Sequence, residues 1–475
     1  MTNAALTRRS FISDLRTVLG GSGFRKLYAT RLISQTGDGI FTSGLGTYVF
    51  FNQTTYPDPG KAAVSFAVLY LPYSLIGPFA GVFIDRWSRR QILAWSAVIR
   101  ASFVVLAAVF IGTGALGLPV WLSVLVVLGV NRFFLSSLSA ALPHVVAPDE
   151  LVMANSVGPT SGTIMGFVGG GIGLAVHWLT GGGQVGSAIT LLTAGVCYLL
   201  ASLSATRIAR DALGPDRDPA GPESAVAAAE SLAAGVMSVA AGLIAGLRHV
   251  WHRPQARAAM SATAAHRFFS GALLLMVILL YRNYFYPGSS ANGALGHFIP
   301  VVASTGLGYA AAALITPVAT RKLSNAAWIT VLLAAAGLVI GGLGVSFGPV
   351  EFIVMGFALG MIAQGITICT TTILQQETED DFRGRVFSVN DMLFNTMFVA
   401  GAALSAAFMP VSGHSVPILL VVAGGYLVAA GGYRIMAGRS QPGQRPPGQE
   451  APGDPPCEEP APASRPDSRA QRSSS

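Results

Sequence analysis

Twelve long apolar runs dominate this sequence and restrict its fold more than any other feature. A helix of about 20 residues crosses the hydrocarbon core of a bilayer. Only 11% of the 475 residues are charged, whereas a soluble chain carries about 25%. The sequence therefore predicts an all-α polytopic membrane protein. Its predicted spans lie near residues 27–52, 62–84, 91–112, 118–142, 152–179, 185–206, 257–285, 296–319, 326–347, 350–374, 384–409 and 415–436.

The basic residues of the loops predict how the chain is oriented. Six basic residues precede or open the first span, whereas the loops on the other side hold only Lys61 and Arg282. Arginine and lysine concentrate on the cytoplasmic side of membrane proteins. We therefore expect a multi-pass protein of the cell membrane, inner or plasma, with both termini in the cytoplasm. The net charge of +8 then reflects this orientation, and we expect no binding of nucleic acid.

One long hydrophilic break divides the twelve spans into six and six. It begins with "RDALGPDRDPAGPES", which is typical of a linker, and continues as an Ala-rich amphipathic helix. The last residues are rich in Pro, Gly and Ser, a composition that predicts disorder. The expected organisation is a cytoplasmic segment 1–26, a six-helix bundle 27–207, a cytoplasmic linker 208–255, a second six-helix bundle 256–437 and a disordered cytoplasmic tail 438–475.

The two halves repeat each other's loops. "GVFIDRWSRR" joins spans two and three, and "PVATRKLSN" joins spans eight and nine. "APDELVMANS" opens span five, and "TEDDFRGRVFS" opens span eleven. Repeats of this kind are typical of pseudo-symmetric transporters, in which the binding site lies between the halves near the bilayer midplane.

The loop between spans two and three carries a recognisable motif, Gly81-x3-Asp85-Arg86-x2-Arg89-Arg90. This motif resembles that of the major facilitator superfamily, although the family usually has glycine where Ser88 stands. "FRKLYATRLISQTGDGIF", "AGLRHVWHRPQAR" and "DDFRGRVFS" are similar to the branch that contains bacterial drug, macrolide and siderophore exporters. The resemblance covers about residues 24–437. It implies a secondary active transporter whose two halves rock around a central site.

The resemblance also implies a cytoplasmic gate. A carboxylate is stabilised by the positive end of a helix, and spans three and eleven both begin near the motif in a fold of this family. The alternative is that the arginines only anchor the orientation, which leaves the acid and the glycine spacing unexplained. The expected gate consists of Gly81, Asp85, Arg86, Arg89 and Arg90, with Arg383 and Arg385 at the start of span eleven.

Charged residues inside spans are costly and are usually functional or paired. Asp38 is either the carboxylate that binds and releases a proton or one member of a permanent ion pair, with Arg100 or Arg132 as its partner. Asp391 is a second proton-coupling candidate or a solvated rim residue. The candidates for the lining of a central cavity are Asn131, Arg267, Gln364, Thr367, Asn390 and Asn395.

The glycine run "MGFVGGGIGLAV" in span five only partly matches a glycine motif of exporters. Glycines in membrane helices more often allow close packing, and we favour that interpretation here.

Several classes of function leave no trace in the sequence. It has no G-x4-G-K-[ST] phosphate loop for ATP, no metal-ligand spacing and no cluster of catalytic residues. We therefore expect no enzyme activity, no cofactor and no metal. The expected function is proton-coupled export of a small amphipathic molecule such as a drug, siderophore or secondary metabolite. The expected partners are this molecule, protons and the bilayer, and the expected state is a monomer. Uptake of a small nutrient and a polytopic membrane enzyme or sensor are the alternatives.

Overall fold

A computed structural model describes residues 19–51, 59–76, 88–114, 117–147, 151–209, 212–213, 225–286 and 291–439. Within these ranges every regular element is helical. One group of six long helices comprises α2 (Ser22–Phe51), α3 (Pro59–Ile76), α5 (Arg89–Gly112), α6 (Leu118–Ala141), α7 (Leu151–Leu179) and α8 (Gly183–Thr206). A second group comprises α10 (Pro254–Leu279), α11 (Ala291–Ala319), α12 (Asn325–Leu343), α13 (Pro349–Glu377), α14 (Asp380–Ala406) and α15 (Val416–Arg439).

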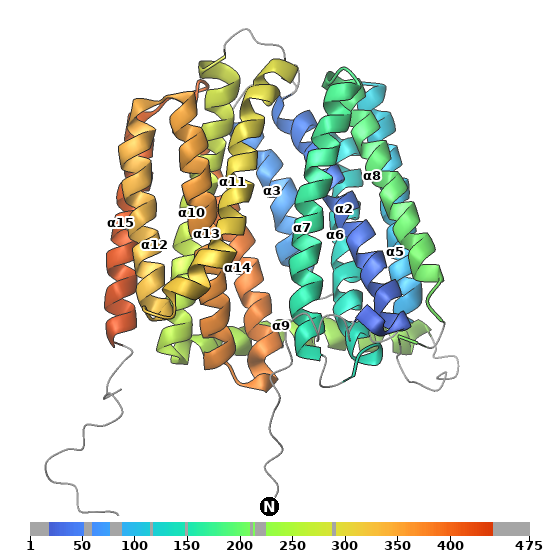
Figure 1. The fold of residues 1–475 in the computed structure, drawn as a ribbon. Helices are drawn as coiled ribbons and strands as arrows, with labels where there is room; N and C mark the ends of the chain where they lie inside the picture. The colour runs from blue at the N-terminus through green and yellow to red at the C-terminus, as the bar shows by residue number, and fades with distance from the viewer. Residues whose placement is uncertain are drawn as a thin grey trace, which may run out of the picture.

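The two groups form two bundles that stand side by side (Figure 1). Between them in the chain lies α9 (Ala225–His252), which runs across one end of the bundles. Short helical turns extend three spans: η2 (Leu142–His144) follows α6, the π-helical η3 (Leu280–Tyr284) follows α10, and η4 (Gly344–Ser346) follows α12. The first bundle begins and the second ends at the same end as α9, which is the end expected in the cytoplasm.

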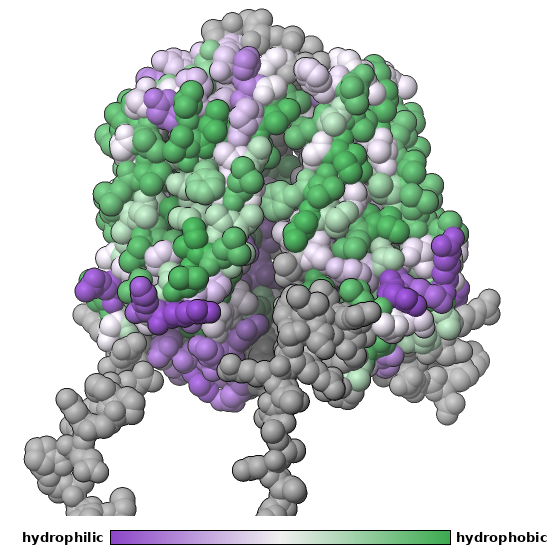
Figure 2. Space-filling view, in the orientation of Figure 1, coloured by the Kyte–Doolittle hydropathy of each residue, from purple (hydrophilic) through white to green (hydrophobic). Residues whose placement is uncertain are grey.

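The surface of the bundles is that of a protein embedded in lipid. Hydrophobic side chains cover the middle of the face seen in Figure 2, and hydrophilic side chains gather at its lower end. Large apolar side chains are well exposed, among them Trp178 at 65% and Val428 at 76%. Soluble monomers rarely expose continuous apolar surface of this extent. Ten of the described helices are long and apolar enough to cross a membrane. Of the two remaining helices of the bundles, α2 carries charges such as Arg31 and Asp38, and α3 is described for only 18 residues.

Glycines allow α2 and α7 to cross with their backbones in contact. A Cβ atom on Gly39 would overlap the carbonyl oxygen of Gly166, and one on Gly169 would overlap that of Thr36. Farther along the same crossing, a Cβ on Gly173 would overlap the hydroxyl of Ser43. The glycine run of span five therefore packs against α2, as small residues do at helix interfaces in membranes.

The second bundle repeats this crossing between α10 and α14. A Cβ atom on Gly271 would overlap the carbonyl oxygen of Phe398, and one on Gly401 would overlap that of Phe268. Gly39 and Gly271 are separated by the same number of residues as Gly169 and Gly401. The two bundles are thus built on one repeated helix pair, which agrees with the repeated loops in the sequence.

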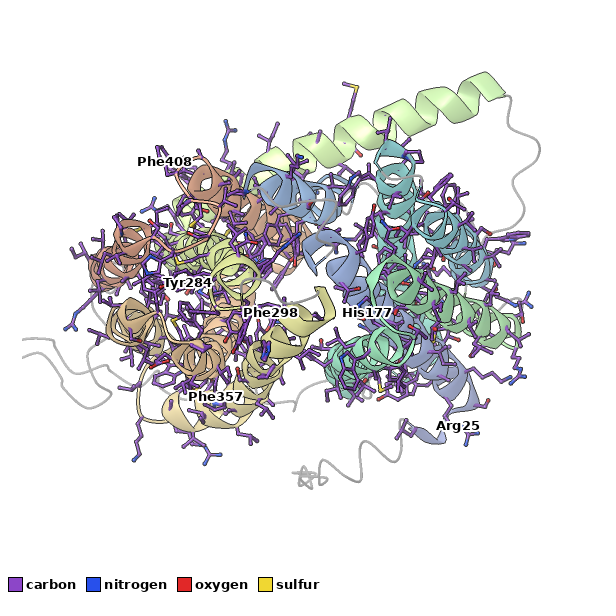
Figure 3. The ribbon with its side chains drawn as sticks, turned by 90° about the horizontal axis from the view of Figure 1, so that it is seen from above. Arg25, His177, Tyr284, Phe298, Phe357 and Phe408 are labelled. Carbon is purple, nitrogen blue, oxygen red and sulfur yellow. The ribbon has the colours of Figure 1, made fainter. Side chains whose placement is uncertain are left out.

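The helix α9 packs against the beginning of α14. Gly246 lies against Arg385, where an added Cβ would be 3.0 Å from the Cβ of Arg385. The ring of His249 stacks on that of Phe382 with centroids 4.5 Å apart. Seen along the bundles, α9 follows one edge of the molecule (Figure 3). This contact ties the connecting segment to the second bundle at the start of α14.

Candidate functional site

Five charged residues lie in the central layer of the described spans, more than ten residues from both ends of their helices when η2 is counted with α6. They are Asp38 on α2, Arg100 on α5, Arg132 on α6, Arg267 on α10 and Asp391 on α14. An ionised side chain at this depth needs a partner or a function. The contacts of each residue therefore show what the site can do.

The structure pairs Asp38 with Arg100. The Nη2 atom of Arg100 donates to Oδ1 of Asp38 in an ion pair, and its Nη1 atom donates to the Ser34 hydroxyl at 3.0 Å. The Tyr198 hydroxyl donates to the same Oδ1 atom of Asp38 at 3.0 Å. Of the two partners that the sequence allowed for Asp38, the structure selects Arg100.

Aromatic rings complete the enclosure of Arg100, whose side chain is fully buried. Its guanidinium carbon lies 3.8 Å from the ring centre of Tyr198 and 5.5 Å from that of Phe134. A cation over an aromatic face is attracted by the ring quadrupole, most strongly where water is excluded. The pair and its rings join α2, α5, α6 and α8, so this charge cluster lies wholly inside the first bundle.

Two further charged residues face each other across the two bundles at a distance that allows electrostatic interaction. Asp391 lies on α14 of the second bundle, and Arg132 on α6 of the first bundle attracts it electrostatically. The residue before Arg132, Asn131, is buried and lies near Asp38. Adjacent residues of α6 thus reach the carboxylate of each bundle.

Arg267 lies in an aromatic environment on α10. Its Nε atom donates to the carbonyl oxygen of Phe394 at 3.1 Å. Its guanidinium carbon lies 3.8 Å from the ring centre of Phe394 and 4.4 Å from that of Phe398. Tyr70 on α3 and Tyr309 on α11 are near enough to interact with it electrostatically.

Aromatic side chains also join the two bundles around Arg267. The ring centre of Phe398 lies 4.8 Å from that of Tyr70 and 5.5 Å from that of Phe66, both on α3. The ring of Phe167 on α7 lies 6.0 Å from that of Tyr309 on α11. The interface at this level is therefore made largely of rings, with Arg267 beside them.

The other candidates for the cavity lining do not form one cluster. Asn395 is buried and its amide donates to the backbone oxygen of Asp391 at 3.0 Å. Asn390, Gln364 and Thr367 are partly buried, and the Thr367 hydroxyl donates to the Ala363 carbonyl of its own helix at 2.8 Å. The structure gathers Asn390, Asp391 and Asn395 on α14, whereas Gln364 and Thr367 lie on α13.

The expected gate is only partly described. Gly81, Asp85 and Arg86 lie outside the described residues, as does the side chain of Arg383. In the first bundle, Arg89 donates to the carbonyl of Leu213 at 3.0 Å and Arg90 to that of Thr206 at 2.7 Å.

Arg385, from the second bundle, lies against α9, and its guanidinium carbon is 5.3 Å from the Phe382 ring centre. The three gate arginines with described side chains, Arg89, Arg90 and Arg385, are thus held within their own half or by α9.

The residues that hold the buried arginines could not be recognised from the sequence. Tyr198 and Ser34 hold Arg100, and Phe394, Phe398 and Tyr70 surround Arg267. Tyrosine, serine and phenylalanine are ordinary in membrane helices, so nothing in their identity distinguished them. The spacing of Phe394 and Phe398, four residues apart on one helix face, is the one signal that was available. Among the described residues, no cluster of three His, Cys, Asp or Glu side chains could hold a metal ion.

Comparison with known proteins agrees with this architecture. The family model described as Major Facilitator Superfamily matches residues 27–402. An uncharacterized MFS-type transporter of Mycobacterium tuberculosis is 35% identical over 442 residues, which are 91% of this chain and 96% of that protein. A relative from Mycobacterium bovis, also described as an uncharacterized MFS-type transporter, has the same identity and coverage.

Solved transporters share the fold at low sequence identity. A mutant of the peptide transporter POT superposes with a TM-score of 0.65 at 12% identity, covering 87% of this chain and 94% of that one. A mutant of the nucleoside transporter NupG superposes with a TM-score of 0.62 at 15% identity, covering 86% and 98%. At these identities the comparison concerns the arrangement of the helices.

Proposed function

Since the chain belongs to the major facilitator superfamily, we propose that it exports a small amphipathic molecule by proton antiport with alternating access. The chain is a multi-pass membrane transporter with twelve helices in two bundles, and it is not an enzyme. Its substrate, its direction and its coupling ion are parts of the proposal. Resemblance to the exporter branch supports the direction.

The placement of Asp391 and Arg132 in the central layer of opposite bundles, near enough to interact electrostatically, carries the proposal of proton coupling. These residues lie on opposite bundles, so rocking of the halves changes the distance between them. A nearby cation favours the ionised form of a carboxylate, and burial without the cation favours the protonated form. A carboxylate that gains and loses its cation during the cycle can take up a proton on one side and release it on the other.

The same reasoning gives Asp38 a secondary role. Its partner Arg100 is in its own bundle and is fully buried, so rocking of the halves leaves the pair together. We therefore assign proton coupling first to Asp391, and treat Asp38 and Arg100 as a pair that stabilises the first bundle. This order differs from the expectation based on the sequence, in which Asp38 stood first.

We further propose a location in the cell membrane with both termini in the cytoplasm, and a monomer as the working unit. The basic residues at the end of the bundles that carries α9 support this orientation. On this side, Asp85 and Arg86 with Gly81, Arg89, Arg90, Arg383 and Arg385 form the cytoplasmic gate in our proposal.

Two measurements test the proposed function in sequence. Cells with and without the gene are exposed to a panel of amphipathic drugs and metabolites, and the accumulation of each compound is measured. Export predicts lower accumulation in cells that carry the gene, and higher accumulation would identify an importer. A compound found in this way is then followed in proteoliposomes that contain the purified protein and a pH-sensitive dye.

Proton antiport predicts that a compound gradient drives proton movement in the opposite direction. Asp391→Asn should abolish this exchange and leave substrate-driven counterflow, which needs no net proton transfer. Asp38→Asn/Arg100→Gln is the matched control, because it also removes one central carboxylate but leaves Asp391. Transport by wild-type protein that ignores the pH gradient would refute proton coupling.

A further inference from the structure

The central layer contains one more cation than its acids can compensate. Asp38 is paired with Arg100, and Asp391 is attracted by Arg132. Arg267 is the third arginine of this layer. None of the described carboxylates lies within ion-pairing distance of Arg267, and the side chains that interact with it electrostatically are tyrosines and the adjacent His266, none of them a carboxylate. A charge at this depth without a counterion is costly and marks a functional site.

The described residues satisfy only part of the hydrogen-bonding capacity of the Arg267 guanidinium. Its Nε atom donates to the backbone carbonyl of Phe394, and its guanidinium carbon lies over two phenylalanine rings. Among the described residues no oxygen accepts a hydrogen bond from Nη1 or Nη2, and neither atom is sealed from open space. The two terminal nitrogens form one edge of the guanidinium fork, which matches the two oxygens of a carboxylate.

The surroundings of this fork define what else a ligand must carry. The rings of Phe394 and Phe398 lie next to the guanidinium, and Tyr70 on α3 and Tyr309 on α11 are near enough to interact with it electrostatically. Rings of this kind favour an apolar or aromatic body, which they contact by stacking and edge-to-face packing. Because Tyr70 belongs to the first bundle and Arg267 to the second, a ligand here contacts both halves.

We propose that Arg267 binds the single negative group of the transported molecule, and that this molecule is a small organic anion with an apolar or aromatic body. This inference rests on the proposed transport function and specifies its substrate class. One excess cation accommodates one negative charge, so a monoanion leaves the central layer neutral when bound. The bound anion also bridges α10 and α3, which links occupancy to the position of the two bundles.

The test compares three ligands of nearly equal shape on the purified full-length protein. The probes are 2-naphthoate, 2-naphthamide and 2-naphthylmethylamine, which are anionic, neutral and cationic at neutral pH. Their dissociation constants are measured in detergent by isothermal titration calorimetry. A hydrogen-bonded charge favours the anion by about tenfold or more over the neutral amide, and we expect the amine to bind most weakly.

Variants then locate the preference. Arg267→Gln should bring naphthoate to the affinity of naphthamide, and Arg267→Lys, which keeps the charge but loses the fork, should retain part of the difference. Arg434→Gln is the matched control, because it makes the same change at an exposed position near the end of α15 and should preserve the preference. Thermal unfolding without ligand shows whether each variant is folded.

Equal binding of naphthoate and naphthamide by wild-type protein would overturn the inference, whatever the variants do. So would the absence of saturable naphthoate binding, or a folded Arg267→Gln that still prefers the anion. Transport in proteoliposomes distinguishes a failure of the anion site from a failure of the proposed antiport. If naphthoate binds but no compound is transported in response to a pH gradient, the anion site stands and the antiporter is refuted. If a pH gradient drives transport of neutral or cationic compounds only, the antiporter stands and the anion site is refuted.

Discussion

The Asp38–Arg100 pair offers the sharpest test of how charge is used inside the first bundle. Asp38→Asn removes the negative charge but keeps the shape and an oxygen that can accept from Tyr198 and Arg100. Arg100 is fully buried, with Ser34 at 3.0 Å and the Tyr198 ring at 3.8 Å as its other partners. Breaking a buried pair costs about 3–5 kcal/mol, because the remaining charge is left uncompensated.

We expect the lower end of this range, about 3 kcal/mol, because asparagine keeps an acceptor near the guanidinium. For a bundle of this size, a loss of 1 kcal/mol lowers the melting temperature by about 2–4 °C. The melting temperature of the Asp38→Asn variant should therefore be roughly 6–12 °C below that of the wild type. The measurement is thermal unfolding of the purified protein, followed by tryptophan fluorescence.

A double-mutant cycle separates the pair from its surroundings. Arg100→Gln leaves Asp38 unpaired and should also destabilise the protein, whereas Asp38→Asn/Arg100→Gln should lose about 3 kcal/mol less than the sum of the single variants. Arg132→Gln combined with Asp38→Asn is the matched control. If Arg100 is the partner, this second combination should be additive within about 0.5 kcal/mol.

Transport by the double variant decides between a structural pair and a proton carrier. A structural pair predicts that Asp38→Asn/Arg100→Gln recovers both stability and transport that follows the pH gradient. Recovery of stability without any response to the pH gradient would refute our assignment and make Asp38 the proton carrier. Additivity of Asp38→Asn with Arg100→Gln would refute the pairing itself.

Three further predictions concern packing, gating and orientation. Gly39→Ala should destabilise the protein by roughly 3 kcal/mol, because its Cβ overlaps a backbone oxygen of α7, whereas Gly46→Ala, with open space around it, should leave the melting temperature nearly unchanged. Asp85→Asn should slow transport severalfold at normal protein abundance, and wild-type rates would reduce the motif to an orientation anchor. A cysteine placed at Asp58 should react with a membrane-impermeant thiol reagent in intact cells while Cys457 does not, and labelling of Cys457 would reverse the proposed orientation.

The sequence was sufficient for the fold because hydrophobicity and charge act locally along a membrane chain. Each apolar run must become a helix, since the bilayer satisfies no backbone hydrogen bonds, and the repeated loops indicated two related halves. The presence of Asp38, Arg100 and Arg132 in the central layer could be counted from the ends of their spans. These predictions depend on the position of a residue along its helix, and that position can be counted from the sequence.

The partners of those charges depend on rotation about the helix axes, which the sequence does not contain. Arg100 and Arg132 are at similar depth, and only the packing of α5 against α8 brings Arg100 to Tyr198 and so to Asp38. The bond from Arg89 to the carbonyl of Leu213 joins residues far apart in the chain for the same reason. The environment of Arg267 also depended on which faces of α10 and α14 meet.

The kinds of contact also indicate where the molecule can move. The crossings of α2 with α7 and of α10 with α14 bring backbone against backbone at glycines, and a contact of that kind has no side chains that can reorient. The bundles meet instead through rings of Phe66, Tyr70 and Phe398, together with the Arg132–Asp391 attraction. Rings and long charged side chains can change rotamer at modest cost. Motion should therefore occur at the seam between α3 and α14, where the proposed substrate anion and the proposed proton both bind, while each bundle moves as a unit.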